Sequence, residues 1–242
     1  NLTLNGNITI RDDANPAVNA NIHTNSNFQM NGVNTVKGFL TYSGNAHSNP
    51  EWRMNTAISP NVNPDSAPVH SQQSPIEIPD FNPDDYLGIA TVVHHGNFLM
   101  SGNNTLGTKE NPAIIYVGGD LNLSGNITGY VAFIVKGNVN ISGNVNITSL
   151  DPTGNNLGLY TKGNVNISGN VNVKAQILAT QNVNLNGNVK VYGSVTTKGV
   201  VNFNGNIGIY YRPATEELTA PFWVGETTGN ELLRPTIISY YE

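Results

Sequence analysis

The chain of 242 residues contains no cysteine and few charged residues. Without cysteine, disulfide bridges and thiolate metal sites are excluded. Asp, Glu, Lys and Arg make up 11% of the residues, against about 25% in ordinary globular domains. The net charge is -5 and no basic cluster stands out in the sequence, which argues against nucleic acid as a partner.

Long hydrophobic runs are missing as well. No apolar run reaches the roughly 18 residues that span a bilayer, and no signal peptide is found. We therefore expect no membrane insertion by this chain. It opens at Asn1 on repeat-like sequence without an initiator methionine, so we expect it to be a mature protein or a piece of a longer one.

Asparagine and glycine dominate instead, and they are arranged in repeats. The words "KGNVNISGNVNI" begin at Lys136 and return as "KGNVNISGNVNV" at Lys162. Within each run the glycines lie a multiple of six residues apart, and three hexads align like with like. The aligned aliphatic sets include Val165, Val183 and Val201, then Ile167, Leu185 and Phe203.

These aliphatic residues alternate with asparagine, which is the period-two signal of a β-strand. Each hexad therefore predicts a short strand that ends at a glycine corner. Three strands make a coil of about 18 residues, and coils stack about 4.8 Å apart as parallel sheets. The predicted fold is all-β: a three-sided parallel β-solenoid, or β-helix. We favour right-handed winding, because the hexad lacks the aliphatic–Gly pair typical of left-handed hexapeptide helices.

We expect one domain over residues 1–242, with four parts. Residues 1–46 form less regular N-terminal coils, 47–95 a Pro-rich insertion, 96–209 the regular coils and 210–242 a C-terminal cap over the open strand edge. The segment "SLDPTGNN" (149–156) interrupts the hexad spacing and predicts a loop insertion.

One side of the predicted solenoid carries apolar residues where outward polar ones are expected. The exposed strip would contain Ile114, Tyr116, Ile134, Tyr160 and Leu178. Such a strip marks a covered or interacting surface. Residues 47–95, which hold seven of the 13 prolines, supply a cover. We expect this segment to lie along the strip as a lid, the alternative being another chain.

The lid ends in "NPDDYLGIATVV" (82–93), which predicts a short helix. Asn82 stands at the N-cap position, Pro83 follows at the first helical position, and Asp84 and Asp85 occupy the first turn.

Catalytic and metal-binding patterns are weak. Solenoid lyases and hydrolases need stacked acids, but the coils 113–209 hold only Asp120 and Asp151. Lys136 and Lys162 share a corner position without a carboxylate in register. We expect no enzyme activity, no cofactor and no metal; a site at His94 and His95 would need a third ligand such as His70 or Asp85.

The asparagine rows have two interpretations. Rows such as Asn166–Asn184–Asn202 can chain amide hydrogen bonds from coil to coil and serve stability. The alternative is that they hold a ligand. Ice binding is a further possibility for a flat solenoid face, although regular threonine arrays would be expected there.

Three stretches carry a resemblance to known families: "NPAIIYVGGDLNLSGN" (111–126), the repeated "GNVNISGN", and "VYGSVTTKGVVNFNGNIGIYYRPA" (191–214). They resemble the solenoid regions of bacterial PilX-like proteins associated with type IV pilus assembly, as does "IEIPDFNPDDY" before the main coils. The plan of a solenoid with a shielded apolar face is similar to that of the tāpirins. That resemblance implies a cell-surface adhesin that binds cellulose.

We therefore expect a non-catalytic, extracellular adhesin domain at the cell surface, pilus-associated, that binds an insoluble plant polysaccharide such as cellulose. Aromatic rings that stack on sugars would carry the binding: Trp52, Tyr86, Tyr116, Tyr160, Phe222 and Trp223. The alternative is a structural subunit of a pilus tip or extracellular filament. A polysaccharide lyase or hydrolase is a third reading, against which the missing acids count.

Overall fold

The computed structural model describes residues 2–12, 22–24, 28–31, 34–36, 40–42, 70–72, 78, 80–148 and 157–211. Its strands form one 15-stranded sheet and one 3-stranded sheet. Every recorded pairing is parallel, from β1–β18 to β5–β6. The predicted all-β parallel solenoid is therefore confirmed.

The strands of the solenoid are short in the early coils and long in the later ones. The early coils contain β7 (Val92–His94), β8 (Phe98–Met100), β9 (Asn103–Leu106), β10 (Ala113–Val117), β11 (Leu121–Leu123), β12 (Asn126–Gly129) and β13 (Val131–Val135). The later coils contain β14 (Val139–Thr148), β15 (Leu157–Thr161), β16 (Val165–Ala179), β17 (Val183–Thr197) and β18 (Val201–Tyr211). The N-terminal strands are β1 (Leu2–Asp12), β2 (Ile22–Thr24), β3 (Phe28–Asn31), β4 (Asn34–Val36) and β5 (Leu40–Tyr42), and β6 is His70–Gln72.

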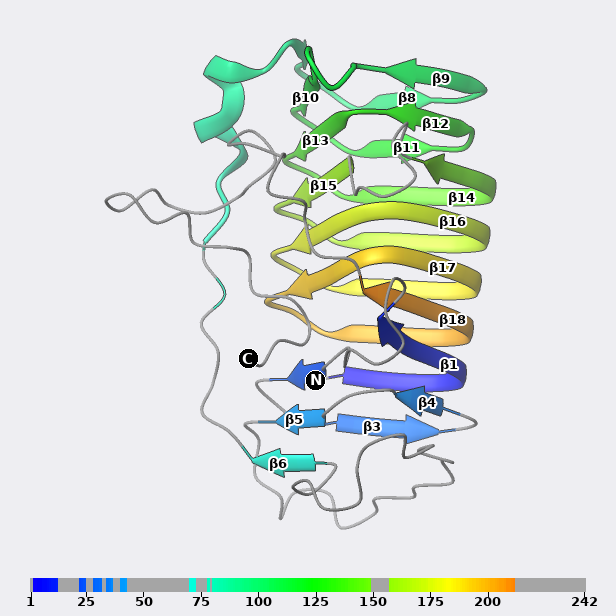
Figure 1. The fold of residues 1–242 in the computed structure, drawn as a ribbon. Helices are drawn as coiled ribbons and strands as arrows, with labels where there is room; N and C mark the ends of the chain where they lie inside the picture. Colours follow the sequence, from blue (N-terminus) through cyan, green and yellow to red (C-terminus); the bar gives the residue numbers. More distant parts are fainter. Residues whose placement is uncertain are drawn as a thin grey trace.

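The order of the coils in space differs from their order in the chain (Figure 1). The main solenoid begins with β7, β8 and β9 and runs coil by coil to β18. The next coil is β1, from the opposite end of the sequence, which pairs with β18 over its whole length from Leu2↔Val201 to Asp12↔Tyr211. Beyond β1 lie β3 and β4. The first strand of the chain thus lies next to the last strand that the structure describes.

The spacing between paired residues follows the hexad arithmetic in the later coils, whereas some pairs in the early coils lie 23 or 20 residues apart, as in Phe98↔Leu121 and Ile127↔Ile147. Asn166 lies 18 residues from its partner Asn184, as predicted. Asn140 and Asn166 are 26 residues apart, because residues 149–156 add eight residues to that coil. The structure of residues 149–156 lies outside the described residues, but the register places the insertion where the sequence predicted it.

The inward residues of all coils form one continuous apolar core. Its side chains come from every coil between β8 and β1, and many are fully buried, including Leu4, Leu121, Phe133, Val171 and Leu185. A single coil has too little apolar area to hold itself folded, so the stack is the stable unit.

Glycine at the corners is required by backbone geometry. Gly205 has a φ of 116°, a value that side chains other than glycine rarely adopt. A Cβ at Gly205 would also lie 2.4 Å from the carbonyl oxygen of Gly187 in the coil before it. Both constraints recur at Gly169 and Gly187 and keep one corner of the stack tight.

A second corner is closed by side-chain acceptors. The Oδ1 atoms of Asp120, Asn138, Asn164 and Asn182 each accept a backbone N–H from the next coil, at 2.7, 2.9, 3.0 and 2.8 Å. Backbone groups at a corner cannot join a strand ladder, and a buried unpaired N–H is costly. These side chains therefore supply the missing partner, coil after coil.

Several predicted boundaries need correction. Strands β6 and β7 both lie inside the segment 47–95, which was expected to be a Pro-rich lid with a short helix. The regular coils thus begin at Val92, and β18 continues to Tyr211 rather than ending at residue 209. The edge of β18, which residues 210–242 were expected to cap, is covered by β1. Residues 212–242 lie outside the described residues.

Candidate functional site

The apolar side of the solenoid is covered by the segment around residues 78–90. Tyr116, Ile134, Tyr160 and Leu178 lie in one row, each paired with the next. With Ile114 and Ala132 they form a second apolar cluster, separate from the main core, in which Phe81 is buried and Ile78, Tyr86 and Ala90 pack at the margin. The 3-10 helix η2 (Pro83–Ile89) lies beside β10 and β13 (Figure 1).

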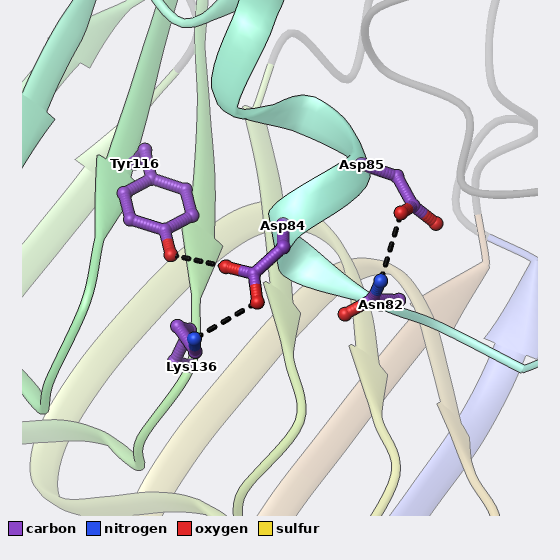
Figure 2. A network of polar contacts seen from close by, with 5 residues as sticks. All are labelled: Asn82, Asp84, Asp85, Tyr116 and Lys136. Carbon is purple, nitrogen blue, oxygen red and sulfur yellow. Dashed lines mark hydrogen bonds and ion pairs between the residues drawn. The ribbon is translucent and has the colours of Figure 1, made fainter.

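A polar clasp fixes this lid to the solenoid (Figure 2). The Tyr116 hydroxyl donates to Asp84 Oδ1 at 2.6 Å, and Lys136 Nζ donates to Asp84 Oδ2 at 2.9 Å. Lys198 forms a second ion pair with Asp80. Lys136, for which the sequence offered no carboxylate partner in register, therefore has one from the lid. The Asn82 side chain donates to Asp85 at 2.8 Å instead of capping the helix.

The clasp shifts the titration of its members. The hydrogen bonds from Tyr116 and Lys136 lower the pKa of Asp84 below its ordinary value. Burial, then the hydrogen bond to Asp84, raises the pKa of Tyr116. The hydrogen bond to Asp84 raises the pKa of Lys136, and the bond from Lys198 lowers the pKa of Asp80. All four pKa shifts favour the protonation states that make these bonds: ionised Asp80 and Asp84, protonated Lys136 and neutral Tyr116.

Two of the six aromatic residues expected to stack on sugars are buried. Tyr116 and Tyr160 are 4% and 1% exposed beneath the lid, so neither ring offers a face to a ligand. The Phe81 ring lies 6.3 Å from Tyr160 and 5.7 Å from Tyr86, measured between centroids. Tyr86 is half-buried at the lid margin. Trp52, Phe222 and Trp223 lie outside the described residues.

An uncovered side of the solenoid carries continuous rows of amides. On the first strand of each coil, Asn122, Asn140, Asn166, Asn184 and Asn202 stand in register. Each Nδ2 donates to the Oδ1 of the preceding residue, at 3.1, 3.0, 2.9 and 2.9 Å along the row. A second row, two residues further along each strand, contains Ser142, Ser168, Asn186, Asn204 and Asn5. We call these ten residues the amide face.

The amide face is polar but without charge. Its first row is half-exposed, and Ser142, Ser168, Asn186 and Asn204 of the second row are exposed. None of the ten residues ionises near neutral pH. Of the three sides of the solenoid, this one is chemically uniform and open to solvent.

The remaining side is also open but mixed in chemistry. It carries asparagine and threonine in the early coils, and Lys174, Tyr192, Tyr210 and Arg11 in register in the later ones. No pattern in the sequence singles out this row of residues. Arg11 joins it only through the docking of β1 on β18, which no local pattern reveals.

No group of three or more His, Asp or Glu side chains with metal-binding geometry occurs among the described residues. His94 stacks on Phe98 with ring centroids 3.8 Å apart. No helix in the described part of the chain is long and apolar enough to cross a membrane.

Comparison with known proteins identifies no family for the chain. No protein-family model matches the chain, and no curated protein matches it. Among solved structures, an ice binding protein from an Antarctic bacterium, Flavobacteriaceae, aligns with 86% of this chain at a TM-score of 0.47 and 14% identity. The alignment covers 44% of that protein, so the chain spans less than half of its length.

Proposed function

We propose that the chain is a non-catalytic, extracellular binding domain that attaches to an insoluble, uncharged polysaccharide of the cellulose type through its amide face. The observation that carries the proposal is the unbroken register of neutral polar side chains over successive coils. Attachment at the cell surface beside type IV pili is the setting implied by the resemblance of the repeats to PilX-like proteins and tāpirins.

The chemistry of the amide face suits a ligand rich in hydroxyl groups. A side-chain amide has two N–H donors and two acceptor lone pairs. In the row from Asn140 to Asn184, each residue uses one donor and one lone pair for its neighbours in the row. The second N–H and the second lone pair remain for a partner outside the row, and sugar hydroxyls both donate and accept.

The rows also hold these groups in fixed positions before any ligand arrives. Each asparagine is bonded on both sides, so its rotamer is set by its neighbours. Binding then costs less side-chain entropy than it would with free surface amides. Strands stack about 4.8 Å apart, so donors and acceptors repeat at that interval along the face. Such a regular array of donors and acceptors suits the regular array of hydroxyl groups on the surface of an insoluble polysaccharide.

The test is a pull-down of the purified chain on insoluble glycans, with cellulose first. The double variant Ser142→Lys, Ser168→Lys places two bulky charges on the amide face without removing a recorded hydrogen bond. We expect its binding to fall by about tenfold or more, because the lysines must be desolvated against a neutral surface. Wild-type binding should change little with salt, since no ion pair is involved.

The control variant is Glu110→Gln, Asn111→Lys, which makes the same change in net charge in the exposed loop between β9 and β10. It should bind as the wild type does. Equal loss in both variants, or no saturable binding by a folded wild-type chain, contradicts the proposal. Inhibition of ice growth without glycan binding would assign the face to a different solid.

A second candidate, a structural subunit of a filament, has one observation in its favour. Leu87, Ile89, Val92, Val93 and Leu99 are exposed around the first coil of the main solenoid, Leu99 at 67%. In the described part of the chain, no strand pairs with the outer edges of β7, β8 and β9. A filament subunit should self-associate as its concentration rises, whereas an adhesin domain should stay monomeric in light scattering.

A further inference from the structure

The second open side of the solenoid, unlike the neutral amide face, carries positively charged side chains, although the net charge of the protein is negative. Lys174, Tyr192, Tyr210 and Arg11 occupy successive strands at one register position, on β16, β17, β18 and β1. Lys190 lies two residues before Tyr192 and faces the same way, exposed to solvent. We call these five residues the basic stripe.

The two tyrosines of the stripe stack on each other. Their ring centroids are 4.8 Å apart with an interplanar angle of 20°. The Arg11 guanidinium lies 5.1 Å from the centroid of the Tyr210 ring, a cation–π contact that continues the stack. The Tyr210 ring lies over Gly208, where a Cβ would come within 2.6 Å of it. One face of each ring is thus covered by the other ring, and Arg11 covers the second face of Tyr210. Lys174 stands at the same register position on the strand beyond Tyr192.

Among the described residues, no acidic side chain is found beside Lys174, Lys190 or Arg11 on their own side of the solenoid. The outward positions of this side, from β9 through β12, β14, β16, β17 and β18 to β1, contain asparagine, threonine, lysine, tyrosine, glycine and arginine but neither Asp nor Glu. The recorded ion pairs among the described residues belong to Lys136 and Lys198 at the lid. Arg11 Nε is buried and has no hydrogen-bond partner. A local excess of positive charge therefore stands on a chain whose net charge is -5.

We propose that the basic stripe binds an anionic polysaccharide, a sugar chain that carries carboxylates. Four strands at about 4.8 Å spacing put Lys174 and Arg11 about 14 Å apart, with Lys190 between them to one side. This is an elongated arrangement of charge that matches a linear polyanion rather than a single small ion. Arginine suits a carboxylate through its fork of N–H donors, and lysine acts as a point charge.

The stacked tyrosines argue against a nucleic acid as the ligand. Proteins that bind single strands need aromatic faces on which bases stack. In the basic stripe one face of each ring is turned toward the other ring, and the second face of Tyr210 is turned toward Arg11. Three of the four ring faces are therefore already in contact within the stripe. The stripe thus complements the neutral amide face with a site of a different charge class.

The experiment measures binding of soluble polygalacturonate oligosaccharides to the full chain by calorimetry at low ionic strength. Lys190→Glu should weaken binding about tenfold, because an attraction is replaced by a repulsion. Lys162→Glu makes the same charge reversal at an exposed corner away from the stripe and should leave the affinity within about twofold of wild type. Binding should weaken as salt is added.

Further arms make the outcome decisive. A neutral oligosaccharide of equal length should not compete. Tyr192→Leu should weaken polygalacturonate binding while Lys162→Glu does not. No binding by the wild type at low salt, or equal loss in Lys190→Glu and Lys162→Glu, overturns the proposal. So does an oligothymidylate that binds as tightly and depends on Lys190, since the stripe would then be a non-selective polyanion surface. Because the probe is soluble and anionic, failure here leaves the neutral-glycan test on the amide face unaffected.

Discussion

At the scale of single residues, the corner glycines limit what the repeat can tolerate. Gly205 and Gly143 both have positive φ angles, 116° and 99°. They differ in surroundings: a Cβ at Gly205 would meet the Gly187 backbone, whereas a Cβ at Gly143 has nothing within 4 Å. A substitution at Gly143 therefore tests backbone strain alone, whereas one at Gly205 tests backbone strain together with a steric clash.

We expect Gly143→Ala to lower the free energy of unfolding by about 1–2 kcal/mol, the cost of a left-handed conformation for a residue with a Cβ. Gly205→Ala should cost clearly more, because the coil before it must also move. Urea unfolding monitored by circular dichroism measures both values. Equal losses in the two variants would mean that the coils shift freely and that the close approach to Gly187 has no energetic weight.

The residue scale also shows where sequence reasoning succeeded. The alternation of aliphatic and asparagine residues predicted inward and outward sides correctly, since a side-chain period of two leaves no choice of face. It predicted the register of Asn166 with Asn184 because the hexads repeat without gaps. The stacking of Tyr192 on Tyr210 could not be predicted in this way. A single tyrosine at an outward position has no distinctive pattern until its neighbour on the adjacent strand is known.

At the scale of elements, the lid is held by two kinds of contact of unequal weight. Phe81 is buried against the strip, and burying such a side chain contributes about 1.5–3 kcal/mol. The carboxylates of Asp84 and Asp80 are exposed, so their ion pairs are screened by water and salt. Apolar packing therefore holds the lid down, and the clasp sets its position along the solenoid.

Acid should loosen the lid slightly. Asp80 and Asp84 have folded pKa values below their ordinary value, so the stability they contribute is present above that value and is lost as the pH falls through the lowered one. Hydrogen exchange in residues 80–90 should thus rise modestly as the pH drops below about 4. The variant Asp84→Asn, Asp80→Asn should exchange faster at neutral pH and show little further change with acid.

The control for this measurement is Asp85→Asn, whose carboxylate accepts from Asn82 within the lid and does not reach the solenoid. It should keep the acid response of the wild type. Complete release of the lid at low pH would show that the clasp outweighs Phe81, and no response would show that the clasp is dispensable.

The lid also shows why only part of the candidate site could be predicted from the sequence. An outward apolar row with Tyr116 and Ile134 is visible in the repeat, and a Pro-rich segment is visible as an interruption. The partner of Lys136 is not visible, because Asp84 lies outside the repeat and reaches the corner through the path of the lid. Contacts between a repeat and an irregular segment have no register from which to predict them.

At the scale of the whole molecule, the solenoid is closed by a coil taken from the other end of the chain. β1 pairs with β18 along eleven residues, and its side chains Leu2, Leu4, Ile8 and Ile10 complete the core. The second row of the amide face crosses the junction, with Asn5 donating to Asn204, and Asn7 donates to Asn206 beside it. The first row ends at Asn202, opposite Thr3. The repeat could not predict this docking, because every coil edge of the same hexad pattern offers the same backbone groups and the same apolar row.

That arrangement makes β1 the cover of an otherwise open parallel edge. Leu4→Asp should undock it, because Leu4 is 0% exposed and a carboxylate there would be buried without a partner, at a cost of about 4 kcal/mol or more. The bared edge of β18 should then pair with other chains, since uncovered strands are templates for association. Light scattering should show oligomers, while hydrogen exchange of β16 and β17 stays slow.

Thr3→Asp is the matched control, one residue away and facing outward. It adds the same charge without touching the core, so the chain should remain monomeric. Leu4→Asp could also remain monomeric while the amide hydrogens of β1 exchange rapidly. In that case another segment of the chain covers the β18 edge when β1 leaves. If both variants associate, the added charge and not the docking of β1 governs assembly. The pairing of β1 with β18 would then have no special role in keeping the chain monomeric.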